Sequence, residues 1–255
     1  MRVFEVVARL RAAGCVFAED EARVLVEAAR GPEELASLTA RRVAGAPLEH
    51  VVGWAEFCGL RVVVGPGVFV PRRRTGLLAR LAVEGARPGG VVVDLCCGSG
   101  AVGAVVVDRV PGVELHAVDV DPVAVACARR NVGGGRVYEG DLYGPLPVSL
   151  AGRVEVLVAN APYVPTGSIG LMPPEAREFE PRVALDGGVD GLAVQRRVVA
   201  GAARWLAPGG VVLVETGAVQ AAGTVEAFAR GGLCAEVVSD EELSATVVVG
   251  RFGVR

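Results

Sequence analysis

The stretch that decides the fold is residues 91–107, VVVDLCCGSGAVGAVVV. Its first five residues are apolar apart from Asp94 and are typical of a short strand buried in a parallel sheet. A turn containing Gly98 and Gly100 follows, and then a helical segment begins. Such a turn lets backbone N–H groups approach a ligand, and the helix N-terminus favours negative charge. The complete G-x-G-x-x-G fingerprint is absent, because Cys96 occupies the first glycine position.

Strands and helices alternate downstream of Pro88, which predicts an α/β fold with a doubly wound, mostly parallel sheet. The expected strands are Val91–Leu95, Leu115–Val120, Val137–Glu139, Val154–Asn160, Val211–Thr216, Ala235–Ser239 and Thr246–Arg251. The loop between the last two strands is too short for a crossover helix. We therefore expect these two strands to pair antiparallel at one end of the sheet.

The chain upstream of this domain has two different sequence patterns. Residues 2–30 and 32–42 have apolar side chains at helical spacing, with a break near Gly14. From Pro47 to Val70 the apolar residues alternate instead, as in a β-hairpin. We therefore predict a helical cap over residues 1–45, a β-hairpin linker over 46–70 and the α/β domain over 71–255. The cap could recognise a partner or could simply pack, and the sequence favours neither.

Three consecutive arginines, Arg72, Arg73 and Arg74, stand where the hairpin leads into the α/β domain. At a helix entrance they could meet an anionic group of a ligand. A run of like charges more commonly forms a solvated face, and we favour that interpretation.

Composition narrows the classes of function. The 255 residues are 52% hydrophobic and carry a net charge of −3, which gives no basic footprint for nucleic acid. No apolar run approaches the ~18–20 residues of a membrane span. The start of the chain predicts an amphipathic helix, not a signal peptide, so we expect a cytoplasmic protein with reduced thiols. The six cysteines form no C-x-x-C pair and there are only two histidines, so no metal site is expected.

Polar side chains lie at or just beyond the carboxyl ends of the first four predicted strands of the domain: Asp94, Asp119, Asp141 and Asn160. Asp119 lies about 20 residues after the glycine turn, where such folds place an acid that accepts ribose hydroxyls. Asp141 could accept a hydrogen bond from an exocyclic adenine amine, and Leu142 could cover the ring. Each acid alone could instead be a cap or turn residue, but four at consecutive strand ends indicate a nucleotide cofactor. A nicotinamide enzyme stays open at this point, although the later strand ends supply no obvious partner group for hydride transfer.

The motifs DLCCGSG, AVDVDP, GDL and VANAPY, in this order, resemble those of class I S-adenosylmethionine-dependent methyltransferases that methylate amino groups. The chain is most similar to the protein-(glutamine-N(5)) methyltransferases, the HemK/PrmC group, which modify peptide-chain release factors. Further stretches carry this resemblance: Arg41-Arg42 with Gly45-x-Pro47, Gly53-x-x-x-Phe57-x-Gly59, FVPR at 69–72, EPRVALDGGVDGL at 180–192, and VETG at 214–217 with Gln220. The resemblance implies a Rossmann-like sheet of seven mostly parallel strands, with one antiparallel strand near an edge.

The resemblance also implies roles for individual residues. S-adenosylmethionine would be the cofactor, with its ribose on Asp119, its adenine against Leu142 and its methionine part in the turn formed by Cys96, Cys97, Gly98, Ser99 and Gly100. Asn160, Ala161, Pro162 and Tyr163 stand in place of the family's Asn-Pro-Pro-Tyr and would hold the target amide. Two acceptors, the Asn160 side-chain oxygen and the Ala161 carbonyl, could orient the amide nitrogen toward the methyl group. Tyr163 could stack on the flat amide.

The sequence departs from the family pattern at three places. Ala161 replaces a proline, Gly76 stands where the family usually has an acid, and the helical cap is shorter than the family's release-factor-binding domain. The expected substrate is a protein with a target glutamine, for which a release factor is one candidate. An adenine-amino methyltransferase is an alternative that the acidic net charge disfavours. A silent cofactor-binding subunit is another, which the intact Asn160, Pro162 and Tyr163 disfavour.

Overall fold

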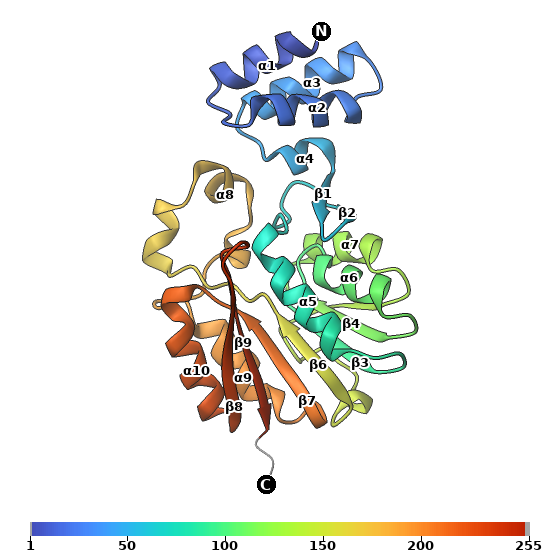
Figure 1. Ribbon diagram of the computed structural model, residues 1–255, viewed down its shortest axis with the longest axis vertical. Helices are drawn as coiled ribbons and strands as arrows, with labels where there is room; N and C mark the ends of the chain where they lie inside the picture. The colour runs from blue at the N-terminus through green and yellow to red at the C-terminus, as the bar shows by residue number, and fades with distance from the viewer. Residues whose placement is uncertain (1, 253–255) are drawn as a thin grey trace.

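A computed structural model describes residues 2–252 and contains a seven-stranded sheet with strand order β5-β4-β3-β6-β7-β9-β8 (Figure 1). Neighbouring strands from β5 to β7 pair parallel, whereas β9 runs antiparallel to both β7 and β8. The strands are β3 Val91–Leu95, β4 Glu114–Asp119, β5 Arg136–Glu139, β6 Val154–Ala159, β7 Leu206–Glu215, β8 Leu233–Asp240 and β9 Ala245–Phe252. The predicted α/β class, with one antiparallel strand near the sheet edge, is confirmed.

The described residues also contain ten α-helices and a separate two-stranded hairpin. The helices are α1 Val3–Ala12, α2 Ala18–Ala28, α3 Pro32–Val43, α4 Leu48–Val52, α5 Gly76–Gly85, α6 Ala101–Arg109, α7 Pro122–Asn131, α8 Pro174–Phe179, α9 Ala193–Ala202 and α10 Ala221–Arg230. The hairpin pairs β1, Trp54–Phe57, with β2, Leu60–Val63. Five short 3-10 turns complete the regular structure: η1 Arg73–Thr75, η2 Val148–Leu150, η3 Thr166–Leu171, η4 Arg182–Ala184 and η5 Ala218–Gln220.

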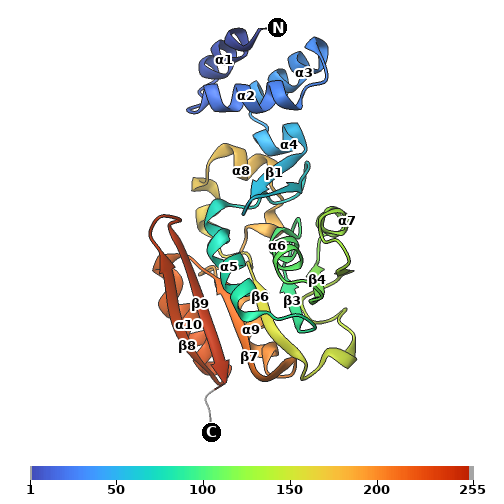
Figure 2. The ribbon, with the colours of Figure 1, turned by 45° about the vertical axis from the view of Figure 1, so that its right-hand side comes forward.

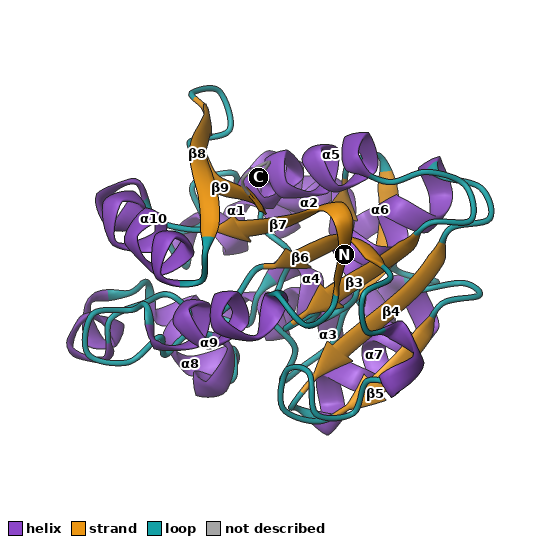
Figure 3. Cartoon of the chain, turned by 90° about the horizontal axis from the view of Figure 1, so that it is seen from below, coloured by secondary structure: helices purple, strands orange, loops and turns teal. Residues whose placement is uncertain are grey.

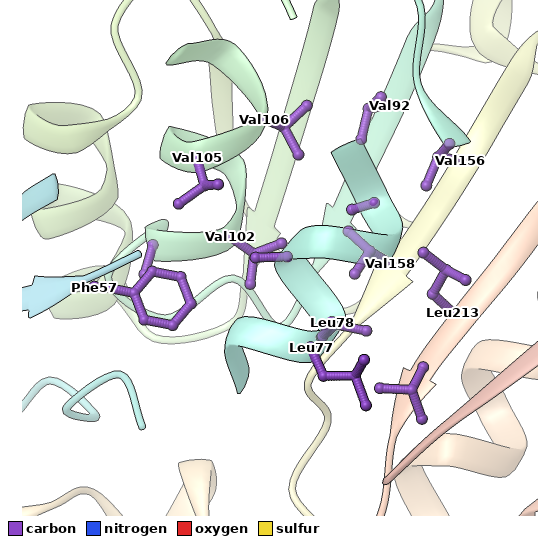
Figure 4. Packing of buried hydrophobic residues seen from close by; sticks show 14 of the residues in the cluster. Phe57, Leu77, Leu78, Val92, Val102, Val105, Val106, Val156, Val158 and Leu213 are labelled. Atoms are coloured by element: carbon purple, nitrogen blue, oxygen red, sulfur yellow. The ribbon is translucent and has the colours of Figure 1, made fainter. Parts of the chain in front are cut away.

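The central strands are buried on both faces because their side chains alternate between two cores. On β6, Val156 and Val158 belong to the cluster that includes residues of α5 and α6 (Figure 4). Leu157 and Ala159 belong to the opposite cluster, which includes residues of α9 and α10. Figure 3 shows these two helix pairs on opposite sides of the sheet. This double burial explains why the central strands are almost continuously apolar and could be recognised in the sequence.

The N-terminal helices α1, α2 and α3 lie at one end of the molecule, beyond the hairpin (Figures 1 and 2). They have their own small core, which includes Val6, Leu10, Leu25 and Leu38. Arg42 of α3 pairs with Glu21 of α2 at 2.6 Å and with Glu175 of α8 at 3.5 Å. The N-terminal helical segment is therefore joined by an ion pair to α8, which lies in the sequence between β6, the central strand of the sheet, and α9.

Several predicted boundaries differ from the structure. The period-two pattern from Pro47 predicted only strands, but α4 occupies 48–52 before β1 begins. Gly53, at φ +86°, ends this helix and lets the chain turn into the hairpin. Strand β7 begins at Leu206, five residues earlier than expected, because Leu206 pairs with Val154 before a register shift. The two ends of β3, the end of β5 and the start of β6 are as predicted, and the remaining strand ends differ by one or two residues.

No helix within residues 2–252 is long and apolar enough to cross a membrane. In the same range, no three or more His, Cys, Asp or Glu side chains gather in a group that could hold a metal ion.

Candidate functional site

The turn after β3 is held in a tight loop by backbone hydrogen bonds. The Cys97 N–H donates to the Val118 carbonyl at 3.0 Å, and the Gly100 N–H donates to the Cys97 carbonyl at 2.7 Å. Cys96 itself has φ +56°, a left-handed conformation that is unusual for a residue with a side chain. The turn therefore has the shape of a glycine turn even though a cysteine occupies its first glycine position.

Gly98 and Gly100 serve different purposes in this turn. Both have positive φ, at +55° and +75°. A Cβ added to Gly98 would meet no protein atom within 4 Å, and Gly98 lines the cavity described below. A Cβ on Gly100 would lie 2.8 Å from a methyl group of Val132 and 3.1 Å from the Ala128 Cβ. Gly98 thus keeps the cavity open, whereas Gly100 permits close packing against α7 and is not among the residues that line the cavity.

Asp119 closes the turn from the end of β4. One carboxylate oxygen accepts from the Gly98 N–H at 2.8 Å, and the other accepts from the Asp121 N–H at 2.9 Å. Burial raises the pKa of Asp119, and these backbone hydrogen bonds oppose the shift. Each oxygen has a further lone pair, so the carboxylate can accept two more donors. Asp121 caps α7 by accepting a hydrogen bond from the Val123 N–H at 2.8 Å.

Asp94 lies deeper, at the end of β3, and is 2% exposed. Its carboxylate accepts from the Gly103 N–H of α6 at 3.1 Å. Burial raises the pKa of Asp94 to about 7, and the nearby Asp119 contributes in the same direction. A cationic ligand group in the cavity would favour the charged form of this carboxylate.

The third strand end places Asp141 and Leu142 at the far side of the same cavity. Leu142 has φ +48° and is buried against Val118 and Leu95 in one cluster. The carboxylate of Asp141 pairs with the Arg197 guanidinium of α9 at 2.5 Å. Arg197 was not predicted and also lines the cavity.

The segment after β6, Asn160–Tyr163, is called the NAPY turn from here on. The Asn160 amide nitrogen donates to the Thr75 hydroxyl at 3.3 Å. The Tyr163 hydroxyl donates to Glu215 of β7 at 3.2 Å. Because its nitrogen is engaged by Thr75, the Asn160 oxygen is the atom left free to accept from a ligand. Thr75 and Glu215, neither of which was among the predicted site residues, hold the two ends of the turn.

The arginine run is not simply a solvated face. Arg72 donates to both oxygens of Glu180 at 2.6 Å and lies 4.9 Å from the Phe69 ring centroid, so the solvated interpretation is wrong for this residue. Arg74 pairs with Glu215 at 3.4 Å while its side chain remains 45% exposed. Arg73 is exposed, as expected. Two of the three arginines therefore neutralise buried carboxylates behind the cavity wall.

The backbone of the NAPY turn rests on the DGGVDG segment. A Cβ on Gly187 would lie 2.7 Å from the Pro162 carbonyl oxygen, and one on Gly191 would lie 2.3 Å from the Tyr163 carbonyl oxygen. The Gln220 amide donates to that Tyr163 oxygen at 2.9 Å and to the Asp190 carbonyl at 3.0 Å. The two glycines and Gln220 thus fix the path of the turn from behind.

The glycine turn, the ends of β4 and β5 and the NAPY turn surround one cavity of about 380 Å³. Every predicted site residue lines it except Gly100: Asp94, Cys96, Cys97, Gly98, Ser99, Asp119, Asp141, Leu142, Asn160, Ala161, Pro162 and Tyr163. The cavity is continuous from the glycine turn to the NAPY turn. It can therefore hold two reactants, one beneath each turn.

Comparisons with known proteins identify the kind of enzyme. The family description "Methyltransferase small domain" matches residues 60–169. A release factor glutamine methyltransferase from Geobacter sulfurreducens is 40% identical over 230 residues, which cover 87% of this chain and 80% of that protein. The chain belongs to the release factor glutamine methyltransferase family. It is a methyltransferase, and its sequence resemblance is confirmed.

One relative is named for a different substrate. A 4-amino-L-phenylalanine/4-methylamino-L-phenylalanine methyltransferase from Streptomyces pristinaespiralis is 37% identical over 75% of this chain and 68% of that protein. Among solved structures, a methyltransferase from Pyrococcus furiosus aligns with a TM-score of 0.57 at 17% identity, over 77% of this chain and 91% of that one. The latter comparison shows the fold alone.

Two departures from the family pattern can be located in the structure. Ala161 is 1% exposed and lines the cavity within the NAPY turn. Gly76 begins α5, and a Cβ there would make ordinary contacts, 3.5 Å from the Cys58 sulfur and 3.8 Å from Leu243. Neither change leaves a gap in the hydrogen bonds that hold the NAPY turn, since those involve Asn160, Tyr163 and their partners.

Proposed function

We propose that this methyltransferase transfers a methyl group from S-adenosylmethionine to the side-chain amide nitrogen of a glutamine in a peptide-chain release factor. The observation that carries the proposal is the shared cavity. The NAPY turn opens into the same space as Asp119 and the glycine turn, in a chain 40% identical to a protein named for this activity.

The cofactor end of the cavity suits S-adenosylmethionine. Asp119 has lone pairs free for the two ribose hydroxyls, and Gly98 leaves open space where any side chain would intrude. We assign Leu142 to the adenine, Asp141 to its exocyclic amine, and Cys96, Cys97, Ser99 and the nearby Asp94 to the methionine part. Asp94 can neutralise a cationic group of the cofactor, and its raised pKa makes it sensitive to such a charge.

The target end suits a primary carboxamide. Its nitrogen is a poor nucleophile, because the lone pair is delocalised into the carbonyl group. The Asn160 oxygen and the Ala161 carbonyl can accept its two N–H groups, which orients the nitrogen and favours the positive charge that develops there. Pro162 stiffens the turn, and the Tyr163 ring can lie against the amide plane.

Bound S-adenosylmethionine supplies the methyl group on a sulfonium, an activated leaving group. The amide nitrogen would form its bond to this methyl carbon as the carbon–sulfur bond breaks, and it would lose one proton to solvent. The chain's residues therefore have to orient the amide, exclude competing water and accept hydrogen bonds. No nucleophilic side chain is required.

The N-terminal part would serve the protein substrate. We propose that the helical cap, residues 1–45, contributes to its recognition, that 46–70 links the cap to the catalytic part, and that 71–255 carries the reaction. Val16 and Phe17 of the cap are 84% and 69% exposed, so they offer apolar contacts. We also propose a cytoplasmic site of action, because release factors work on ribosomes.

A substrate panel tests this proposal. The purified chain is incubated with labelled S-adenosylmethionine and, separately, with release factors, total lysate protein, DNA and 4-amino-L-phenylalanine. We expect label in a release factor, on a glutamine side chain. Label confined to DNA would favour the adenine-amino alternative, and label confined to 4-amino-L-phenylalanine would favour the activity for which the Streptomyces relative is named. Either result would overturn the proposed substrate.

A further inference from the structure

Glu215, at the carboxyl end of β7, is a buried carboxylate with no part in the chemistry described so far. It is 1% exposed. One oxygen accepts from the Tyr163 hydroxyl and pairs with Arg74, while the other is buried and has no hydrogen-bond partner among residues 2–252. A buried, incompletely paired carboxylate costs stability, and an apolar residue of similar size would commonly be more stable there. Its contacts therefore point to a task other than folding.

Two routes lead from Glu215 to the NAPY turn. The direct route is the 3.2 Å hydrogen bond from the Tyr163 hydroxyl. The second passes through Thr75, which is 3% exposed, accepts from the Asn160 amide nitrogen and lies close enough to Glu215 to lower the pKa of that carboxyl. A hydroxyl that accepts from Asn160 still has its own proton to donate to a carboxylate. A charged Glu215 therefore favours a Thr75 hydroxyl whose proton points toward the carboxylate and whose lone pairs face Asn160.

We propose that Glu215 is a positioning residue for the target amide. Through Thr75 it keeps the Asn160 nitrogen engaged and the Asn160 oxygen free for the substrate, and through the hydroxyl of Tyr163 it sets the tilt of that ring. This role rests on the function proposed above. It means that Glu215, which does not line the cavity, helps to set how the target amide is held.

The role depends on the charged form of Glu215. Only a carboxylate accepts from the Thr75 and Tyr163 hydroxyls without offering a competing proton. Burial raises the pKa of Glu215, and its interactions with Thr75, Arg74 and Tyr163 oppose this rise. Arg74, before α5, and Tyr163, after β6, are the charged and titratable groups that face it. Activity should therefore decline as pH falls through this raised pKa.

The test compares Glu215→Gln with a matched control, Glu155→Gln. Glu155 lies on β6 far from its carboxyl end and pairs with Arg87. For each protein, kcat and KM for the release factor are measured across pH, with the cofactor Kd measured by calorimetry. We expect Glu215→Gln to lower kcat/KM about 10- to 100-fold, as displacement of reacting groups does, with the cofactor Kd unchanged within about 2-fold. The acidic decline of the wild type should be lost in Glu215→Gln and kept in Glu155→Gln.

A double-mutant cycle shows whether Glu215 acts through the turn. The loss caused by Glu215→Gln should be smaller in a Tyr163→Phe background, and Glu215→Asp should recover part of the activity. Wild-type kcat/KM in Glu215→Gln, full additivity with both Tyr163→Phe and Thr75→Val, or an equal loss of cofactor affinity would overturn the proposal. If Glu215→Gln does not fold, the same kinetic and cofactor-binding measurements are made on Glu215→Asp and Thr75→Val. A wild-type protein that methylates no glutamine would overturn the proposed function itself.

Discussion

The cofactor half of the cavity is built mainly from backbone contacts, whereas the target half is held by side chains from distant parts of the chain. In the first half, the N–H groups of Cys97, Gly98 and Gly100 make the defining hydrogen bonds, all within the segment from β3 to β4. In the second half, Asn160 and Tyr163 depend on Thr75 and Glu215, which are 85 and 52 residues away. Apart from Asp141, which pairs with the distant Arg197, the cofactor half should therefore respond mainly to local changes, whereas the target half should also respond to remote ones.

The largest expected effect is at Asn160, which would separate the two halves most clearly. Asn160→Ala removes an acceptor of the target amide but leaves the glycine turn intact. We expect turnover to fall roughly 100-fold or more, by analogy with the loss of one preorganised polar contact. Calorimetry should show cofactor binding within about 2-fold of wild type. Full turnover in this variant would mean that the target amide binds elsewhere.

The complementary change is Asp119→Asn in the cofactor half. The substituted amide brings a donor toward two backbone N–H groups that already donate to this position. We expect a 10- to 100-fold weaker cofactor Kd, the size of a lost hydrogen bond to a charged group. At saturating cofactor, kcat should stay within a few fold of wild type. Asp108→Asn, on the exposed side of α6, is the control, and equal effects of the two changes would contradict the assignment of Asp119.

A glycine pair tests how strongly the target half depends on its support. Gly191→Ala would place a Cβ 2.3 Å from the Tyr163 carbonyl oxygen, whereas Gly152→Ala, at a similar positive φ, meets no atom within 4 Å. Both variants carry the same backbone strain. We expect Gly191→Ala to lower kcat/KM about 10-fold more than Gly152→Ala does, since a displacement of ~1 Å can cost up to 100-fold. Equal activities would show that the turn tolerates the displacement.

The smallest expected effect is a pH dependence of stability in the cofactor half. Burial raises the pKa of Asp94 from 3.8 to about 7, so between these values the folded protein holds a proton that the unfolded chain releases. The contribution of Asp94 to stability is therefore present at low pH and is lost as pH rises toward 7. Relative to Asp94→Asn, the wild-type free energy of unfolding should fall by about 2 kcal/mol between pH 5 and pH 7. Denaturant titrations of both proteins at both pH values measure this free energy. A wild-type protein that gains stability relative to Asp94→Asn between pH 5 and pH 7 would contradict the prediction.

The same contrast explains what the sequence could and could not predict. Strand ends, the glycine turn and the residues Asp119 and Asn160 follow from local patterns, because apolar runs and turn residues are adjacent in the chain. Thr75 and Glu215 have no such local signal, because their importance arises only when β7 lies beside β6. Glu215 could have been found by applying the strand-end rule to β7 as well, since it ends that strand as Asp119 ends β4.

The arginine run shows a second limit of local patterns. Charge spacing alone favoured a solvated face, and it contained no information about Glu180, which is 108 residues from Arg72. Likewise, the alternation around Pro47 was typical of a strand, but the positive φ of Gly53 allowed a short helix to end there. A tertiary contact decided where the Arg72 side chain lies, and a helix end decided the structure before Gly53. The pattern of polar and apolar residues decided neither.

The central claim is that the NAPY turn presents a glutamine amide to the cofactor's methyl group. Peptide mapping by mass spectrometry of a release factor, incubated with S-adenosylmethionine and either wild-type protein or Asn160→Ala, tests it most directly. The account predicts one added methyl group on a glutamine side-chain nitrogen with the wild type and almost none with the variant over the same time. A methyl group on any other residue type, or equal glutamine methylation by both proteins, would contradict it.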